Sequence, residues 1–253
     1  MTAGLKAGRY RPEAEKARVI RELKKLARPA RDFDARRYFR GDLDLAFYNV
    51  ATGPTRALAR SIVEEHDAWT VDDAMALADV LVCDRYLEVK SVGIELVARY
   101  RHEFTPRLLP HWKRWLAENH SSNWATTDGI SVYLIGALVV RYPELACRIA
   151  TWARHRNLWV RRASIVGLIP AIRKNHALDV AYGVAARLHG DDEDLIQKAV
   201  GWALRECGRV DSVRLECYLR ANGRAIPRTT LRYAIERFAE PKRQSLLKVT
   251  RGL

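Results

Sequence analysis

Most of the short motifs that identify enzymes are missing from this sequence. It has no glycine-rich loop for binding phosphates, no Cys-x-x-Cys pair and no His-Glu-x-x-His run. Its seven histidines are isolated along the chain, and a lone histidine on a helix is more often a surface or core residue than a metal ligand. We therefore expect the protein to use no cofactor and to bind no metal.

Cysteine is also scarce, and long apolar runs are absent. The longest apolar stretch, residues 130–140, is shorter than the roughly 18 residues that span a bilayer. Residues 1–16 are polar and charged and lack the apolar core of a signal peptide. The four cysteines have no metal-type spacing, so we expect reduced thiols at Cys83, Cys147, Cys207 and Cys217. These absences predict a cytoplasmic protein, with neither secretion nor membrane insertion.

Acidic residues are outnumbered, with 30 Asp and Glu against 44 Lys and Arg and a formal net charge of +14. An excess of this size favours a polyanionic partner, because phosphate neutralisation supplies most of the non-specific affinity for nucleic acids. An apolar stripe through Val19 and Leu23 predicts that the basic N-terminal segment is helical. Solvated surface charge is the alternative role for its cations, which include Arg9, Arg11, Lys16, Arg18, Arg21, Lys24, Lys25, Arg28, Arg31, Arg36, Arg37 and Arg40.

Strand-type alternation is missing, whereas apolar residues recur at helical spacing nearly throughout, which predicts an all-α chain. Pro and Gly mark the breaks between the expected helices. These helices cover residues 12–28, 31–40, 55–66, 72–83, 87–101, 105–118, 123–141, 143–156, 158–174, 176–189, 192–208, 211–221, 228–239 and 240–250.

Helical hairpins recur at roughly 35–45 residues, which is the spacing of HEAT-like repeats. Because each hairpin cannot cover its own apolar stripe, the hairpins are expected to stack into a solenoid with a concave basic face. We expect a single HEAT-like repeat domain over residues 1–253. Residues 1–50 fit the repeat pattern least well. A globular helical bundle is the alternative.

One segment places an aromatic side chain and an acid together. In Asn123-Trp124-Ala125-Thr126-Thr127-Asp128, Trp124 and Asp128 are four residues apart and share one helical face. The alternative role for Asp128 is purely structural, since an acid in the first turns of a helix is stabilised by the helix dipole.

Two later segments carry further tryptophans. Trp159 precedes Arg162 by three residues, and an arginine at this place can bind a carboxylate or a phosphate. Gly201 permits close helix packing directly before Trp202, which belongs either to the core or to a groove.

Together these segments resemble the alkylated-DNA glycosylases of the AlkD-like, HEAT-repeat family. The matching motifs are Trp124-x-x-x-Asp128, Trp159-x-x-Arg162 and above all the stretch from Ile196 to Glu206, in the family's order and approximate separation. The resemblance is clearest over residues 85–210 and weak in the first fifty. It implies a DNA glycosylase that hydrolyses the N-glycosidic bond of cationic N3- or N7-alkylated purines in duplex DNA, without flipping the base.

The resemblance also implies residue roles. Asp128 matches the catalytic carboxylate, Trp124 and Trp202 match residues that flank the deoxyribose, and Arg162 matches an arginine near the acid and the DNA backbone. Asn123 departs from the family, whose members often have another aromatic there. We also expect DNA-binding roles for residues of the same segments, namely Trp159, Arg161 and Lys198.

The physics of the reaction agrees with such a site. A purine alkylated at N3 or N7 is already cationic, so it leaves without protonation, and the sugar that remains has oxocarbenium character. A carboxylate and two indole faces stabilise that positive charge. We expect a monomer bound to double-stranded, alkylated DNA in the nucleoid. The alternative, from a different class, is a non-catalytic HEAT-like module that binds DNA or RNA structures or a protein partner.

Overall fold

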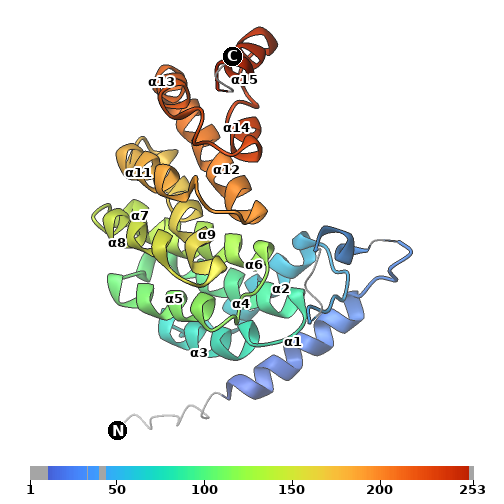
Figure 1. Ribbon diagram of the computed structural model, residues 1–253. Coiled ribbons are helices and arrows are strands. Elements are labelled where there is room, and N and C mark those ends of the chain that lie inside the picture. The colour runs from blue at the N-terminus through green and yellow to red at the C-terminus, as the bar shows by residue number, and fades with distance from the viewer. Residues whose placement is uncertain (1–10, 33, 40–43, 251–253) are drawn as a thin grey trace, which may run out of the picture. The chain divides into compact units, whose positions relative to one another are not determined.

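The computed structural model describes residues 11–32, 34–39 and 44–250. Apart from one isolated bridge between Ala46 and Tyr86, every regular element in these ranges is helical (Figure 1), which confirms the all-α fold class. No helix in the described ranges is long and apolar enough to cross a membrane. The chain forms two compact units, Met1–Glu103 and Phe104–Leu253, which we call unit 1 and unit 2.

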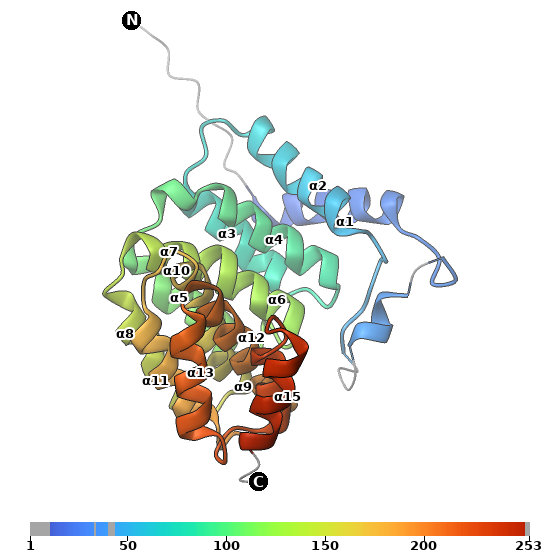
Figure 2. The same ribbon diagram turned by 90° about the horizontal axis from the view of Figure 1, so that it is seen from above.

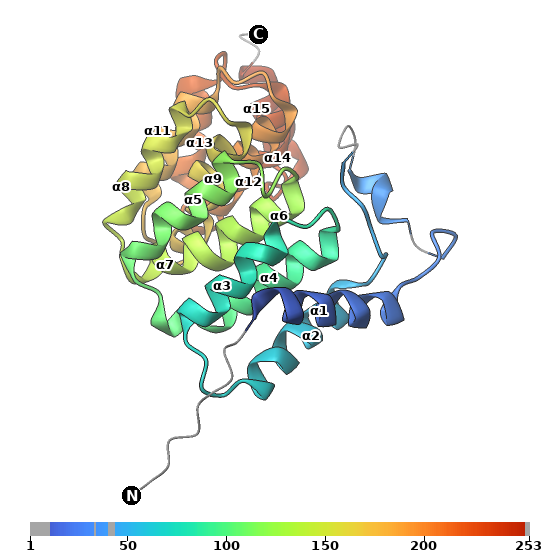
Figure 3. The same ribbon diagram turned by 90° about the horizontal axis from the view of Figure 1, so that it is seen from below.

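The described residues of unit 1 form four α-helices, of which α3 and α4 form a closely packed hairpin (Figure 3). A Cβ atom at Gly93 of α4 would lie 3.0 Å from Leu81 Cβ, so the backbone of α4 packs directly against the Leu81 side chain of α3 at this point. A capping box between Thr70 and Asp73 fixes the start of α3. The bounds are α1 Pro12–Leu26, α2 Thr52–Glu65, α3 Val71–Val82 and α4 Leu87–Arg99.

In unit 2, helices that are neighbours along the chain pack in pairs around fully buried side chains such as Trp112, Trp115 and Leu134. The long helix α12 contacts α9, α11 and α13 (Figure 2), and it also packs against α14. The helices are α5 Leu109–Ala117, α6 Trp124–Gly129, α7 Gly136–Arg141, α8 Leu145–Ala150, α9 Leu158–Val166, α10 Ile169–Ile172, α11 Leu178–Leu188, α12 Asp194–Val210, α13 Ser212–Asn222, α14 Arg228–Ala234 and α15 Glu240–Val249.

This pairing is consistent with the HEAT-like arrangement that the spacing predicts. The concave basic face and the single domain over residues 1–253 stay predictions.

Several expected helices differ from the structure. The helix over 123–141 contains a π-helical segment, that over 143–156 ends as a 3-10 turn, and that over 228–239 ends at Ala234. Two others differ more. The prediction of a helix over residues 31–40 is wrong, because its described part holds only a 3-10 turn, Ala35–Tyr38. The Asp34 carboxylate caps the start of this turn by accepting a hydrogen bond from Arg36 N. Residues 33 and 40, like Arg9 of the basic segment, lie outside the described ranges. The helix over 158–174 divides into α9 and α10, because Pro170 has no N–H to continue the ladder of α9.

Candidate active site

The segment that carries Trp124 and Asp128 is fixed at its start by a side-chain cap. Asn123 is the N-cap of α6, and its Oδ1 accepts a hydrogen bond from Thr126 N at 3.0 Å. Asn123 is buried, whereas Trp124 and Asp128 are half-buried and lie one turn apart. The local sequence thus holds an indole and a carboxylate on the accessible side of a short helix.

Hydroxyl groups anchor the buried side of α6. Ser121 Oγ lies 2.6 Å from Thr126 Oγ1, and Ser131 Oγ donates to Thr127 O at 2.6 Å. All four side chains are buried. Beyond Gly129 the chain continues as a π-helical segment, Ile130–Ile135, before α7 begins. Such segments inside helices are frequent at functional sites.

The carboxylate of Asp128 is held by Arg162 of α9 in a bidentate ion pair. Arg162 Nε donates to Oδ1 at 2.7 Å and Nη2 donates to Oδ2 at 2.8 Å. The third nitrogen, Nη1, donates to the carbonyl of Leu195, near the start of α12. One guanidinium therefore connects α6, α9 and α12, which are far apart in the sequence.

This ion pair is largely sheltered from solvent. The Arg162 side chain is 6% exposed and the Asp128 side chain is 17% exposed. Burial raises the pKa of Asp128 above that of an ordinary aspartate, and the hydrogen bonds and charge of Arg162 oppose that rise. Arg162 accordingly binds a carboxylate in the structure, and its contact with the DNA backbone stays a prediction.

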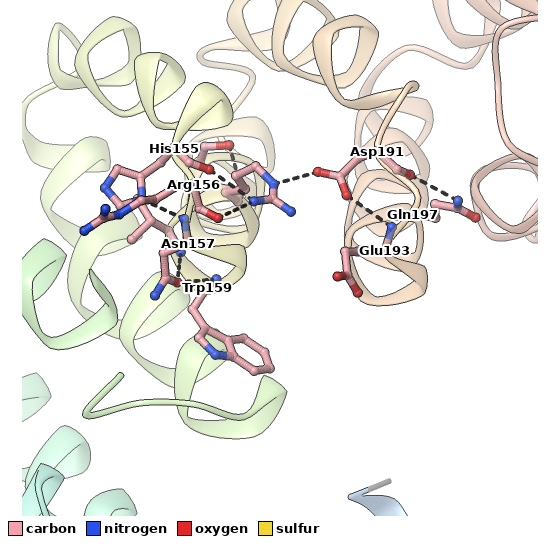
Figure 4. A network of polar contacts seen from close by, with 10 residues as sticks. His155, Arg156, Asn157, Trp159, Asp191, Glu193 and Gln197 are labelled. Atoms are coloured by element: carbon pink, nitrogen blue, oxygen red, sulfur yellow. Dashed lines mark hydrogen bonds and ion pairs between the residues drawn. The ribbon is translucent and has the colours of Figure 1, made fainter. Parts of the chain in front are cut away.

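Next to Arg162, the start of α9 belongs to a second polar network (Figure 4). Asn157 caps the helix by accepting from Trp159 N at 2.8 Å, and the Trp159 indole points away from the network. Arg161 Nε donates to Asp191 Oδ2 at 2.7 Å, and Asp191 Oδ1 in turn accepts from Glu193 N. The backbone that leads into α12 is thereby fixed to α9.

Helix α12 carries the third tryptophan. A side chain at Gly201 would lie 2.7 Å from Thr230 O and closer still to Tyr233, which confirms that this glycine permits close packing, here against α14. Trp202 is half-buried and lies seven residues, or about two turns, beyond Leu195. Lys198 is paired with Asp194 at 2.6 Å in an exposed pair.

Unit 2 also contains most of the excess positive charge. Residues 104–253 include 25 Lys and Arg against 13 Asp and Glu, whereas residues 1–103 include 19 against 17. The unit that holds the Asp128–Arg162 pair is therefore the more strongly basic one, and a basic surface attracts polyanions.

A family model described as "DNA alkylation repair enzyme" matches residues 19–238. The chain belongs to the DNA alkylation repair enzyme family. Solved structures with the same fold include a predicted DNA alkylation repair enzyme from Enterococcus faecalis, with a TM-score of 0.74, 16% identity, and coverage of 85% of this chain and 97% of that one. No curated protein sequence matches the chain.

Two further structures are similar, both from Streptococcus mutans. AlkD2 has a TM-score of 0.61 and 15% identity, and the match covers 91% of this chain and all of that one. The protein smu.31 has a TM-score of 0.54 and 16% identity, with coverage of 93% and 96%. The fold of this member of the DNA alkylation repair family is thus one that the solved structures share at low sequence identity.

In this family member, the structure unites some of the expected site residues directly. Asp128 and Arg162 are bonded to each other, and Trp124 lies one turn before Asp128 on the same helix. Trp202 lies on the helix whose first turn accepts from Arg162. Trp159, Arg161 and Lys198 occupy α9 and α12, but each of the two cations already has an acidic partner.

Sequence reasoning missed the carbonyl of Leu195 and the hydroxyl groups behind α6. Any residue can supply a carbonyl, so nothing in the sequence marks Leu195. The sequence weakly indicates the role of the hydroxyl groups, because Ser121, Thr126 and Thr127 lie close to the start of a helix, where Ser and Thr side chains often cap the backbone. Among the described residues, no group of three His, Cys, Asp or Glu side chains is placed to hold a metal ion.

Proposed function

We propose that the protein is a monofunctional DNA glycosylase acting on cationic N3- or N7-alkylated purines in duplex DNA. The observation that carries this proposal is the Asp128 carboxylate, which Arg162 holds in place and which is 17% exposed, one turn from Trp124 within the basic unit. Membership of the DNA alkylation repair family supports the substrate class.

In the proposed reaction, the bond between C1′ and the purine nitrogen breaks, and the electron pair leaves with the base and neutralises its positive charge. The sugar then carries the positive charge. Asp128 stabilises that charge by about 4 kcal/mol at 4 Å with an effective dielectric constant near 20. Water adds to C1′, oriented by the same carboxylate, and its proton passes to solvent. The products are free base and an abasic site.

The tryptophans supply the second part of the stabilisation. An indole face next to an exposed or partly desolvated cation is worth roughly 0.5–2 kcal/mol. Trp124 and Trp202 are half-buried, in contrast to the fully buried core residues Trp112 and Trp115. We propose that both flank the deoxyribose of the lesion while the base stays stacked in the duplex. Because the site then contacts the sugar and not the base, it selects lesions by their positive charge.

Arg162 has a positioning role in this proposal. Its three guanidinium nitrogens all donate within the protein, two of them to Asp128, and its side chain is nearly buried. It therefore fixes the direction of the carboxylate. Contacts to phosphates are assigned to more exposed cations such as Lys198, whose exposed pair with Asp194 contributes little stability and can exchange for a phosphate.

The experiment that tests the proposal is a base-release assay on duplex DNA that contains N7-methylguanine. The unchanged protein should release free base and leave the strand uncut, and Asp128→Asn should slow that release. Release at an unaltered rate by Asp128→Asn would overturn the mechanism. The matched control is Asp191→Asn, which removes an acid from the neighbouring Arg161 pair.

A non-catalytic DNA-binding module is the second candidate, and one observation favours it. Asp128 is already neutralised by Arg162 through two hydrogen bonds, as expected for a structural ion pair. This candidate predicts tight binding to DNA without release of any base. It also predicts equal behaviour of Asp128→Asn and Asp191→Asn.

A further inference from the structure

Charges of opposite sign are segregated within unit 1. Residues 1–40 contain 13 Lys and Arg against 5 Asp and Glu, whereas residues 41–103 contain 6 against 12. On α1, two cations pair with the acidic part: Lys16 Nζ lies 2.9 Å from Asp84 Oδ2, and Arg18 Nη1 lies 2.7 Å from Glu65 Oε2. The first half of α1 therefore uses its positive charge to bind the helix to its own unit.

The second half of α1 leaves its positive charge at the surface. We call the exposed residues Arg21, Lys24 and Lys25, together with Arg28 two residues after the helix ends, the basic end of α1. Lys25 pairs with Glu22 at 2.8 Å, but its side chain is 68% exposed. Arg21, Lys24 and Arg28 have no carboxylate within ion-pair distance among the described residues. Figure 3 shows this end of the helix leading into the segment that holds the turn Ala35–Tyr38.

The folding of α1 does not account for this arrangement. The helix dipole favours cations in the last turn, which explains Lys24 and Lys25, but the effect fades beyond one turn and does not reach Arg21. Lys25 is paired with Glu22, but Arg21 is three residues from Lys24, a spacing at which like charges repel and destabilise a helix. A bound polyanion removes that repulsion.

We propose that the basic end of α1 binds the phosphates of duplex DNA, as a contact separate from the candidate active site. The choice of DNA among polyanions rests on the proposed function. Each cation that neutralises a phosphate releases a condensed counterion, and this contribution does not depend on sequence or damage. The contact therefore adds affinity for undamaged DNA as well, and brings the protein onto the duplex before a lesion is met.

The test measures binding of the full-length chain to an undamaged DNA duplex by fluorescence anisotropy at several salt concentrations. The triple variant Arg21→Gln, Lys24→Gln, Arg28→Gln removes three cations that lack an acidic partner. At about 0.9 in slope per phosphate, we expect the salt slope to fall by about 2.7 and the affinity at 0.1 M salt to fall by up to roughly 500-fold. The double variant Arg21→Lys, Arg28→Lys keeps the charge and should keep the affinity.

The matched control removes three exposed cations of the same unit that lie outside the basic end of α1. Arg31 is paired with Asp32, Arg37 with Asp34 and Arg60 with Glu64, so their replacement by Gln lowers the net charge equally. We expect a distinctly smaller loss. Equal losses in the two triples would show an effect of total charge alone and overturn the proposal, as would an unchanged salt slope. Because no lesion is present, this result does not depend on whether the protein releases bases.

Discussion

Replacing Asp128 by asparagine removes the charge that the proposed mechanism requires and keeps the shape of the side chain. A carboxylate about 4 Å from the sugar stabilises its positive charge by about 4 kcal/mol with an effective dielectric constant near 20. Arg162 is bonded to both oxygens, so its own charge opposes this effect from roughly twice the distance, by about 2 kcal/mol. That opposing charge is still present in the variant, so the loss is the full effect of the carboxylate, about 4 kcal/mol, which corresponds to a roughly 1000-fold slower release.

The assay is release of N7-methylguanine from a DNA duplex under single-turnover conditions, so that product release does not limit the rate. Asp128→Asn also leaves the nearly buried Arg162 without its charged partner, which costs up to about 3–5 kcal/mol of stability in buried pairs. Thermal unfolding of each variant therefore accompanies the rate measurement.

Asp191→Asn provides the comparison. Asp191 accepts from the residue beside Arg162 at the same 2.7 Å, and its side chain is 12% exposed. This variant should lose comparable stability but keep its release rate within a few-fold. A release rate of Asp128→Asn within three-fold of the unchanged protein would refute the electrostatic reasoning, and so would an equal loss of rate in the two variants.

Three further predictions concern the same site. Because burial raises the pKa of Asp128, its carboxylate should be protonated, and the release rate lost, at a higher pH than for an ordinary aspartate; a pH–rate profile without such a fall would contradict this. Arg162→Ala should slow release but leave the salt slope of DNA binding unchanged, whereas a slope reduced by about 0.9 would instead reveal the backbone contact expected from the sequence. Gly201→Ala should destabilise the protein by about 1–3 kcal/mol in thermal unfolding, because a Cβ there meets α14. The control Gly183→Ala, where a Cβ meets nothing within 4 Å, should be neutral or stabilising.

Periodicity and punctuation predicted most of the helices well, because a helix of ten or more residues repeats its apolar spacing several times. The helix over residues 12–28 corresponds closely to α1, and that over 211–221 to α13. Residues 31–40 failed because a short, charged stretch carries too few apolar positions to distinguish a helix from a turn.

Of the candidate site, the sequence supplied the residue types and the pairing of Trp124 with Asp128, since both lie within one helical turn. The partner of the acid was left open: Arg162 could bind a carboxylate or a phosphate. Only the packing of α9 against α6 and α12 decided for the carboxylate.

By itself, then, the sequence determined the all-helical class, the excess of positive charge and the local geometry of Trp124 and Asp128, because each depends on composition or on residues within one turn. The tertiary structure decided that Asp128 is bound to Arg162, that the Leu195 carbonyl completes the arginine's contacts, and that Arg21, Lys24 and Arg28 stay exposed. These are contacts between residues some thirty positions apart, or exposures set by neighbouring helices, and the spacing of a sequence does not encode them.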